Sequence, residues 1–105
     1  MVNKQLEYVW KKLLNTGNVE DPRIFLTDAT YSFLYSKYYL KDRWPEEDEK
    51  IFYTDIKCAC LYGIFNNFPD TIHNYFLSKS LDANSEDDKR WIYTYFDSYK
   101  VMKNE

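Results

Sequence analysis

The stretch YSFLYSKYYLKDRWPEEDEK, residues 31–50, changes character at a proline and decides how the fold is read. Aromatic and cationic side chains precede Pro45, and four acids in a row, residues 46–49, follow it. The residue before a proline is kept out of the α conformation, and proline itself suits the first position of a helix. Cations near the negative end of one helix and acids at the positive end of the next then account for the reversal. The stretch therefore predicts one helix that ends at Trp44 and another that begins at Pro45.

The rest of the chain repeats the apolar spacing of helices, and no segment alternates as a half-buried strand does. We expect helices at about 6–14, 28–43, 45–65, 72–81 and 85–102, with a short helical turn at 24–26. At 105 residues the chain fits one domain. The predicted fold is all-α, a compact bundle of about five helices in a single domain over residues 1–105. The expected core contains Leu6, Trp10, Leu13, Ile56, Cys60, Ile72, Phe76, Ile92 and Phe96.

Gly63 interrupts a segment, residues 58–65, that is apolar nearly all round. Such a segment is typical of a central helix. A glycine inside a helix costs about 1 kcal/mol relative to alanine. We therefore expect Gly63 to permit the close approach of another helix.

The metal-binding residue types are few. Cys58 and Cys60 are two residues apart, so on a helix their side chains point about 200° away from each other. A zinc site needs four ligands, and His73 is the only histidine. We expect no metal and no cofactor. At least one cysteine should be a buried small hydrophobe, with the other open to alkylation.

No motif for catalysis is found. The chain has no glycine-rich phosphate loop, no serine nucleophile elbow and no carboxylate pair at a recognised spacing. A lone His73 needs a partner for acid–base chemistry, and the sequence identifies none. We predict that the protein is not an enzyme.

Apolar runs and cysteine use bear on location. No run approaches the 18 to 20 residues, roughly, that span a bilayer. The opening residues MVNKQLE lack the apolar segment of a signal peptide. Two closely spaced cysteines do not form a disulfide framework. The expectation is a cytoplasmic protein with no membrane partner.

Aromatic residues and charge carry the functional prediction. Eleven Tyr, seven Phe and three Trp can fill a small core, or the extra tyrosines can prepare a surface for a partner. Residues 1–43 carry a net charge of +2, with seven cations and five anions. Residues 44–105 carry −5, with seven cations and twelve anions, and the acids gather at 46–49 and 82–88. Without any binding partner, helix capping and solubility would account for both acidic runs.

The first functional hypothesis is a small protein-binding module, such as an inhibitor or immunity-type protein. It would bind a basic partner through the acidic helix ends and exposed tyrosines. The alternative partner is a second copy of the chain, in a homo-oligomer. The predicted partner-binding residues are Tyr38, Tyr39, Trp44, Glu46, Glu47, Asp48, Glu49 and Tyr53.

The alternative hypothesis is a single-stranded nucleic-acid binder. Cations interleaved with aromatic rings can hold phosphates while the rings stack on bases. The residues are Lys37, Tyr38, Tyr39, Lys41, Arg43 and Trp44. The net charge of −3 and the pI of about 5.2 argue against this hypothesis, because such domains are usually basic.

Overall fold

Every regular element in the described part of the chain is helical. The structure is a computed structural model that describes residues 4–103. The elements, in chain order, are α1 (Lys4–Thr16), the 3-10 helix η1 (Pro22–Thr27), α2 (Ala29–Tyr35), the π-helical turn η2 (Ser36–Leu40), the 3-10 helix η3 (Glu46–Thr54), α3 (Ile56–Phe65), α4 (Asp70–Lys79) and α5 (Glu86–Lys103). No strand occurs between residues 4 and 103, which confirms the all-α prediction.

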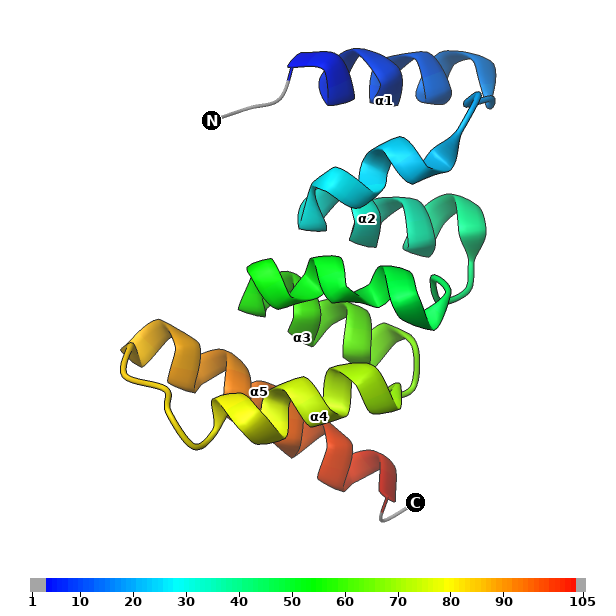
Figure 1. Cartoon of the computed structure of the whole chain (residues 1–105). Helices are drawn as coiled ribbons and strands as arrows, with labels where there is room; N and C mark the ends of the chain where they lie inside the picture. The colour runs from blue at the N-terminus through cyan, green and yellow to red at the C-terminus, as the bar shows by residue number, and fades with distance from the viewer. Residues whose placement is uncertain (1–3, 104–105) are drawn as a thin grey trace.

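The helices stack in layers along the long axis of the molecule (Figure 1). The first layer is α1 alone. Next come η1 with α2 and η2, then η3 with α3, and finally α4 and α5, which cross at the far end. The stack measures 41 × 33 × 21 Å along its principal axes. Every layer after the first therefore contains two helical segments, whereas within residues 4–103 α1 has no second helix in its own layer and packs only on the next layer.

Two clusters of apolar side chains fill the interior. The smaller one, built on Leu6, Leu13 and Phe25, holds α1 against η1 and α2, and the larger one holds the other layers together. Tyr35 packs against both clusters. Every residue of the predicted core lies in one of these clusters or packs against it, and Trp10, Ile56 and Phe96 are the partly buried ones.

Gly63 lies where two neighbouring side chains leave no room for a methyl group. A Cβ at this position would lie 2.8 Å from Ile72 Cγ2 and 2.9 Å from Tyr95 Cε2. The glycine thus lets α3 approach α4 and α5 closely, which confirms the sequence-based expectation.

The helix predicted to reach residue 43 ends earlier. Its last turn widens into η2, where the Lys41 N–H donates to Ser36 O (2.7 Å) and Lys41 adopts a φ of +54°. Trp44 then finds partners outside any helix, with its backbone N–H donating to Tyr62 Oη (2.7 Å) and its indole N–H to Ser32 O (2.9 Å). These tertiary bonds hold the following loop in a non-helical path. The prediction of a helix to Arg43 is therefore wrong by about one turn.

The helix predicted over 45–65 is divided at Asp55. This residue is extended, with φ −152° and ψ 105°, and its side chain accepts from the Cys58 N–H (3.2 Å). An aspartate in that conformation is an N-cap, so a new helix begins after it. The acidic run forms η3, and the apolar segment forms α3. The prediction of one continuous helix is wrong because Asp55 ends η3 and caps a new helix, α3.

Both cysteines are free and buried, Cys58 at 6% and Cys60 at 0% exposure. Burial raises the pKa of Cys60 to about 11 and also raises the pKa of Cys58. The expectation that one thiol is open to alkylation is therefore wrong, because both lie in the larger cluster.

Candidate functional site

The predicted partner surface at 38–53 does not form one patch. Trp44 is 4% exposed and Glu49 is fully buried, so the prediction that both contribute to a surface is wrong. Tyr39 is half-buried, and its ring centroid lies 5.7 Å from those of Trp10 and Tyr35. The smaller cluster takes up the Tyr39 ring, and the larger cluster takes up the Trp44 ring.

The other members of the predicted surface point to different places. Tyr38, Glu46 and Glu47 are exposed. Asp48 accepts two hydrogen bonds from the Arg23 guanidinium, at 3.2 Å and 3.3 Å. Tyr53 is exposed as well, but it packs against α4. These residues lie close in the sequence without sharing one face.

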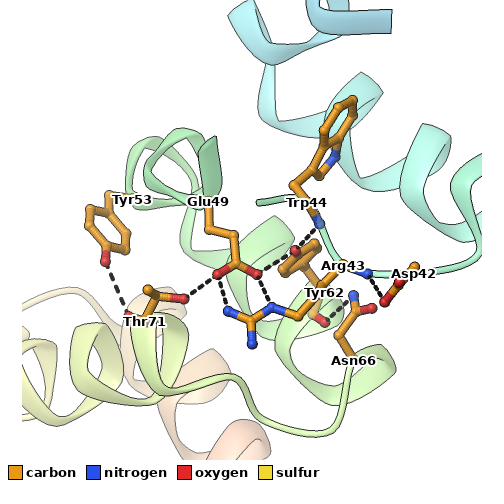
Figure 2. A network of polar contacts seen from close by, with 8 residues as sticks. All are labelled: Asp42, Arg43, Trp44, Glu49, Tyr53, Tyr62, Asn66 and Thr71. Atoms are coloured by element: carbon orange, nitrogen blue, oxygen red, sulfur yellow. Dashed lines mark hydrogen bonds and ion pairs between the residues drawn. The ribbon is translucent and has the colours of Figure 1, made fainter. Parts of the chain in front are cut away.

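The buried carboxylate of Glu49 is instead the centre of a polar network that reaches the surface at Arg43, whose side chain is 39% exposed (Figure 2). Its Oε1 accepts from Arg43 Nη2 (2.5 Å) and from Thr71 Oγ1 (2.6 Å). Its Oε2 accepts from Arg43 Nε (3.0 Å) and from Tyr62 Oη (2.5 Å). Tyr62 Oη accepts in turn from the backbone N–H of Trp44. Four donors from the loop, α3 and α4 thus converge on one carboxylate.

This network is saturated. A carboxylate has about four acceptor positions, and Glu49 has four donors. Burial and the bond to Glu49 raise the pKa of Tyr62, while the hydrogen bond to Glu49 raises the pKa of Arg43. Glu49 has no acceptor position left for a ligand. Its role is to fasten the loop at residues 41–45 to η3, α3 and α4.

The spacing of Glu49 and Phe52 in the sequence is a signal for the burial of Glu49. Glu49 lies three residues before Phe52, which is fully buried, so both belong on one face of the helix. Of the neighbouring acids, Glu46 and Glu47 are exposed, whereas the Asp48 side chain is largely covered in its pair with Arg23. Arg43, just before the acidic run, was the available partner.

Most residues of the nucleic-acid hypothesis already bind or pack against other residues of the chain. Trp44 and Tyr39 pack inward, and Arg43 binds Glu49. Lys37 Nζ lies 5.2 Å from the ring centroid of Tyr38. Of the three aromatic residues, only Tyr38 has an exposed ring, so this stretch offers no row of rings on which bases could stack.

A pair of tyrosines and three acids form a second grouping, which we call the acidic tyrosine face: Tyr53, Tyr75, Asp55, Asp82 and Asp88. The rings of Tyr53 and Tyr75 stack with centroids 4.9 Å apart and planes 3° apart. Tyr53 Oη donates to Thr71 O (3.2 Å), and Tyr53 is 40% exposed. The sequence pointed to Tyr53 but not to its partner on α4.

Acidic side chains act on this tyrosine pair. Burial raises the pKa of Tyr75, and the carboxylates of Asp88, Asp55 and Asp82 raise it further. None of these three acids forms an ion pair within residues 4–103. The nearby cation is Lys79, whose Nζ lies 5.8 Å from the Tyr75 ring centroid. The face therefore combines a fixed aromatic surface with unpaired negative charge.

The two acidic runs lie at opposite edges of the stack (Figure 1). The end of η3, the end of α4 and the start of α5 meet at the left edge, whereas the loop that leads into η3 lies at the right. The segment at 82–88 thus lies at the opposite edge from the start of η3 (Figure 1). Only the run at 82–88 has stacked tyrosines beside it.

His73 and the metal-binding residue types form no cluster. His73 Nδ1 lies 3.0 Å from Tyr95 Oη, and the His73 ring packs against Tyr99 at a centroid distance of 4.5 Å. Within residues 4–103, no three His, Cys, Asp or Glu side chains come together as ligands for one ion. No helix in that range is long and apolar enough to cross a bilayer.

Comparison with known proteins assigns the chain to no family: no family model, curated protein or solved structure matches it. We therefore argue function from side-chain geometry and charge.

Proposed function

We propose that the protein is a small protein-binding module whose acidic tyrosine face binds a basic surface on a partner protein. The observation that carries the proposal is the stacked pair Tyr53–Tyr75 in the field of three unpaired aspartates. Aromatic anchors surrounded by polar groups are typical of interface hot spots. An inhibitor or an immunity-type protein is one form that such a module takes.

The geometry supports a preorganised contact. Tyr53 is held on one side by Tyr75 and at its hydroxyl by Thr71 O. A ring already fixed in place loses little conformational entropy when it binds. The aspartates come from three separate segments, so a cation on the partner would meet several carboxylates at once. Such complementarity raises the association rate and selects a basic partner.

The first step of the test is to find the partner. The tagged protein would be cross-linked in an extract of its native host, and captured proteins would be identified by mass spectrometry. The purified partner would then be titrated calorimetrically at two salt concentrations. We expect a basic protein whose affinity falls as salt rises, because salt screens exposed charges.

Matched variants assign the contact to one edge. Tyr53→Ala should weaken binding about 30-fold, equivalent to about 2 kcal/mol. Asp82→Asn with Asp88→Asn should weaken it and flatten its salt dependence. The controls are Tyr38→Ala, and Glu46→Gln with Glu47→Gln, at positions outside the acidic tyrosine face. If only the controls weaken binding, or if no protein is captured above the level of empty beads, the proposal fails.

A further inference from the structure

A groove of about 860 Å³ runs between α1 and the segment at residues 18–24. Tyr8, Val9 and Lys12 line the wall formed by α1, and Val19, Glu20 and Ile24 line the opposite wall. The three aliphatic residues are half-buried, because their inner sides pack against the smaller cluster. The floor of the groove is therefore a partly exposed surface of the core. The volume lies in the range of sites that bind ligands, about 300 to 1,000 Å³.

The groove lies beside the one layer of the stack that has a single helix. Each later layer pairs two helical segments, whereas within residues 4–103 α1 has no second helix in its own layer (Figure 1). The α1 wall is lined from Tyr8 to Thr16. At 1.5 Å per residue that span is about 12 Å, or somewhat more than two helical turns. A helix lying along α1 would fit this length and would complete the layer.

The side chains around the groove are free to receive such a helix. Tyr8 is 67% exposed at the edge of the groove. Neither Lys12 nor Glu20 forms an ion pair within residues 4–103. Arg23, which also lines the groove, is already bound to Asp48. The unpaired charge on the α1 wall is therefore positive, whereas the opposite wall has two acids, Glu20 and Asp21, and neither forms an ion pair within residues 4–103.

We propose that this groove binds an amphipathic α-helix of a partner protein. The apolar stripe of that helix packs on Val9, Val19 and Ile24, as in other helix-in-groove complexes. An acidic residue on one flank of the helix faces Lys12, and a basic residue on the other flank faces Glu20. The opposite charges on the two walls fix the direction in which the helix lies. This site is separate from the acidic tyrosine face and does not depend on it.

The test uses two synthetic helical peptides that share one leucine stripe at i, i+3, i+4 and i+7 spacing. The acid–base peptide carries glutamates on one flank and lysines on the other. The all-base peptide carries lysines on both flanks. Each peptide is titrated into the isotope-labelled protein, and amide chemical shifts report both the position of binding and its affinity. For the acid–base peptide we expect shifts at α1 and residues 18–24.

Charge reversal at the groove provides the decisive comparison. Lys12→Glu leaves acids on both walls, so it should weaken the acid–base peptide about tenfold and strengthen the all-base peptide, reversing the preference. Lys11→Glu is the matched control, because Lys11 pairs with Glu7 and does not line the groove. It should leave the preference unchanged. Tyr8→Ala should weaken both peptides.

Three outcomes would overturn the proposal. The first is a pattern of shifts centred outside α1 and residues 18–24. The second is an unchanged preference in the Lys12→Glu variant. The third is binding of anilinonaphthalene sulfonate in the groove while neither peptide binds, which would indicate a site for small apolar molecules instead.

Discussion

Acids and tyrosines meet in two regions of this molecule, and the two regions have opposite properties. In the interior, Glu49 is fully buried, and Arg43, Tyr62 and Thr71 fill its acceptor positions. At the acidic tyrosine face, Tyr53 is 40% exposed and the three aspartates have no ion-pair partner in residues 4–103. Similar side chains therefore hold parts of the fold together in one region and form an accessible surface in the other.

The difference follows from solvation. A buried charge without partners is very costly, so Glu49 can be buried only with its donors in place. The carboxylates of the acidic tyrosine face are exposed or half-exposed, so water can hydrate them and none needs an ion-pair partner inside the chain, although Asp55 also caps α3. Mutations should therefore affect stability mainly in the interior and binding mainly at the face. The following predictions, from the largest effect to the smallest, test that division.

The largest loss of stability is expected for Arg43→Ala. This change removes two donors and the positive charge that compensates buried Glu49. We expect the free energy of unfolding to fall by about 3 kcal/mol, measured by urea denaturation. Lys11→Ala, which breaks the exposed pair with Glu7, is the control and should change it by roughly 0.5 kcal/mol or less. A loss below about 1 kcal/mol for Arg43→Ala would show that Glu49 is less dependent on its partners than we infer.

Removing one tyrosine hydroxyl should cost more stability in the interior than at the acidic tyrosine face. Tyr62→Phe leaves Glu49 without one donor and the Trp44 N–H without its acceptor, so we expect a loss of about 2 kcal/mol. Tyr53→Phe removes a hydroxyl that bonds Thr71 O at the surface and should cost roughly 0.5 kcal/mol. Chemical denaturation of the two variants measures both losses of unfolding free energy. Equal losses for the two variants would contradict the division into interior and surface.

Alkaline pH should lower the free energy of unfolding, because tyrosines in the interior resist ionisation. Burial raises the pKa of Tyr62 and of Tyr95 above the value of about 10 in an unfolded chain. As the pH rises, the unfolded state therefore loses these two phenol protons before the folded state does. The contribution of the two tyrosines to stability is complete below pH 10, roughly, and is lost as the pH rises toward the folded-state pKa values.

The expected slope is about 1.4 kcal/mol per pH unit for each such tyrosine above pH 10. Cys60, with a folded-state pKa of about 11, adds a loss that begins near pH 9. Unfolding measured at intervals from pH 8 to pH 11, roughly, checks the profile, and Tyr62→Phe should flatten it. Unchanged stability across this range would mean that the buried phenols do not have raised pKa values.

The smallest effect is expected at the face itself. Asp88→Asn removes the largest of the charges that raise the pKa of Tyr75. The pKa of Tyr75 should fall but stay above its ordinary value, because burial is the larger cause. Ring-proton resonances followed through a pH titration report it. Glu46→Gln, at the opposite edge, is the control and should leave it unchanged. A fall of equal size in both variants would indicate a diffuse field instead of a local cluster.

Predictions from sequence succeeded where the local pattern controls the outcome. Helical periodicity gave the all-α class and core members such as Leu6, Ile72 and Phe76, because the face a residue occupies on a helix follows from its position. Gly63 was interpreted correctly for the same reason. The division at Asp55 was local as well, and its capping side chain could have been recognised from the sequence.

The candidate site was only partly predictable. Tyr53 was expected to be exposed, and it is 40% exposed; its role at a partner surface stays a prediction. Trp44 was assigned to the same surface as an aromatic residue beside charges, and that assignment is wrong. The groups that accept from its two N–H groups belong to Tyr62 and Ser32, which are distant in the sequence. A neighbour in the sequence is a poor guide to burial when the chain turns sharply between residues 41 and 45.

The sequence by itself determined the all-α class, the approximate positions of most helices and most of the residues that face inward, because these depend on interactions within a few positions along the chain. Only the tertiary structure decided which acid is buried and which tyrosines pair. Glu49 meets Thr71 and Tyr53 meets Tyr75, each across 22 residues of sequence. Such contacts depend on how the layers stack, and the desolvation of each charge is set by that stacking.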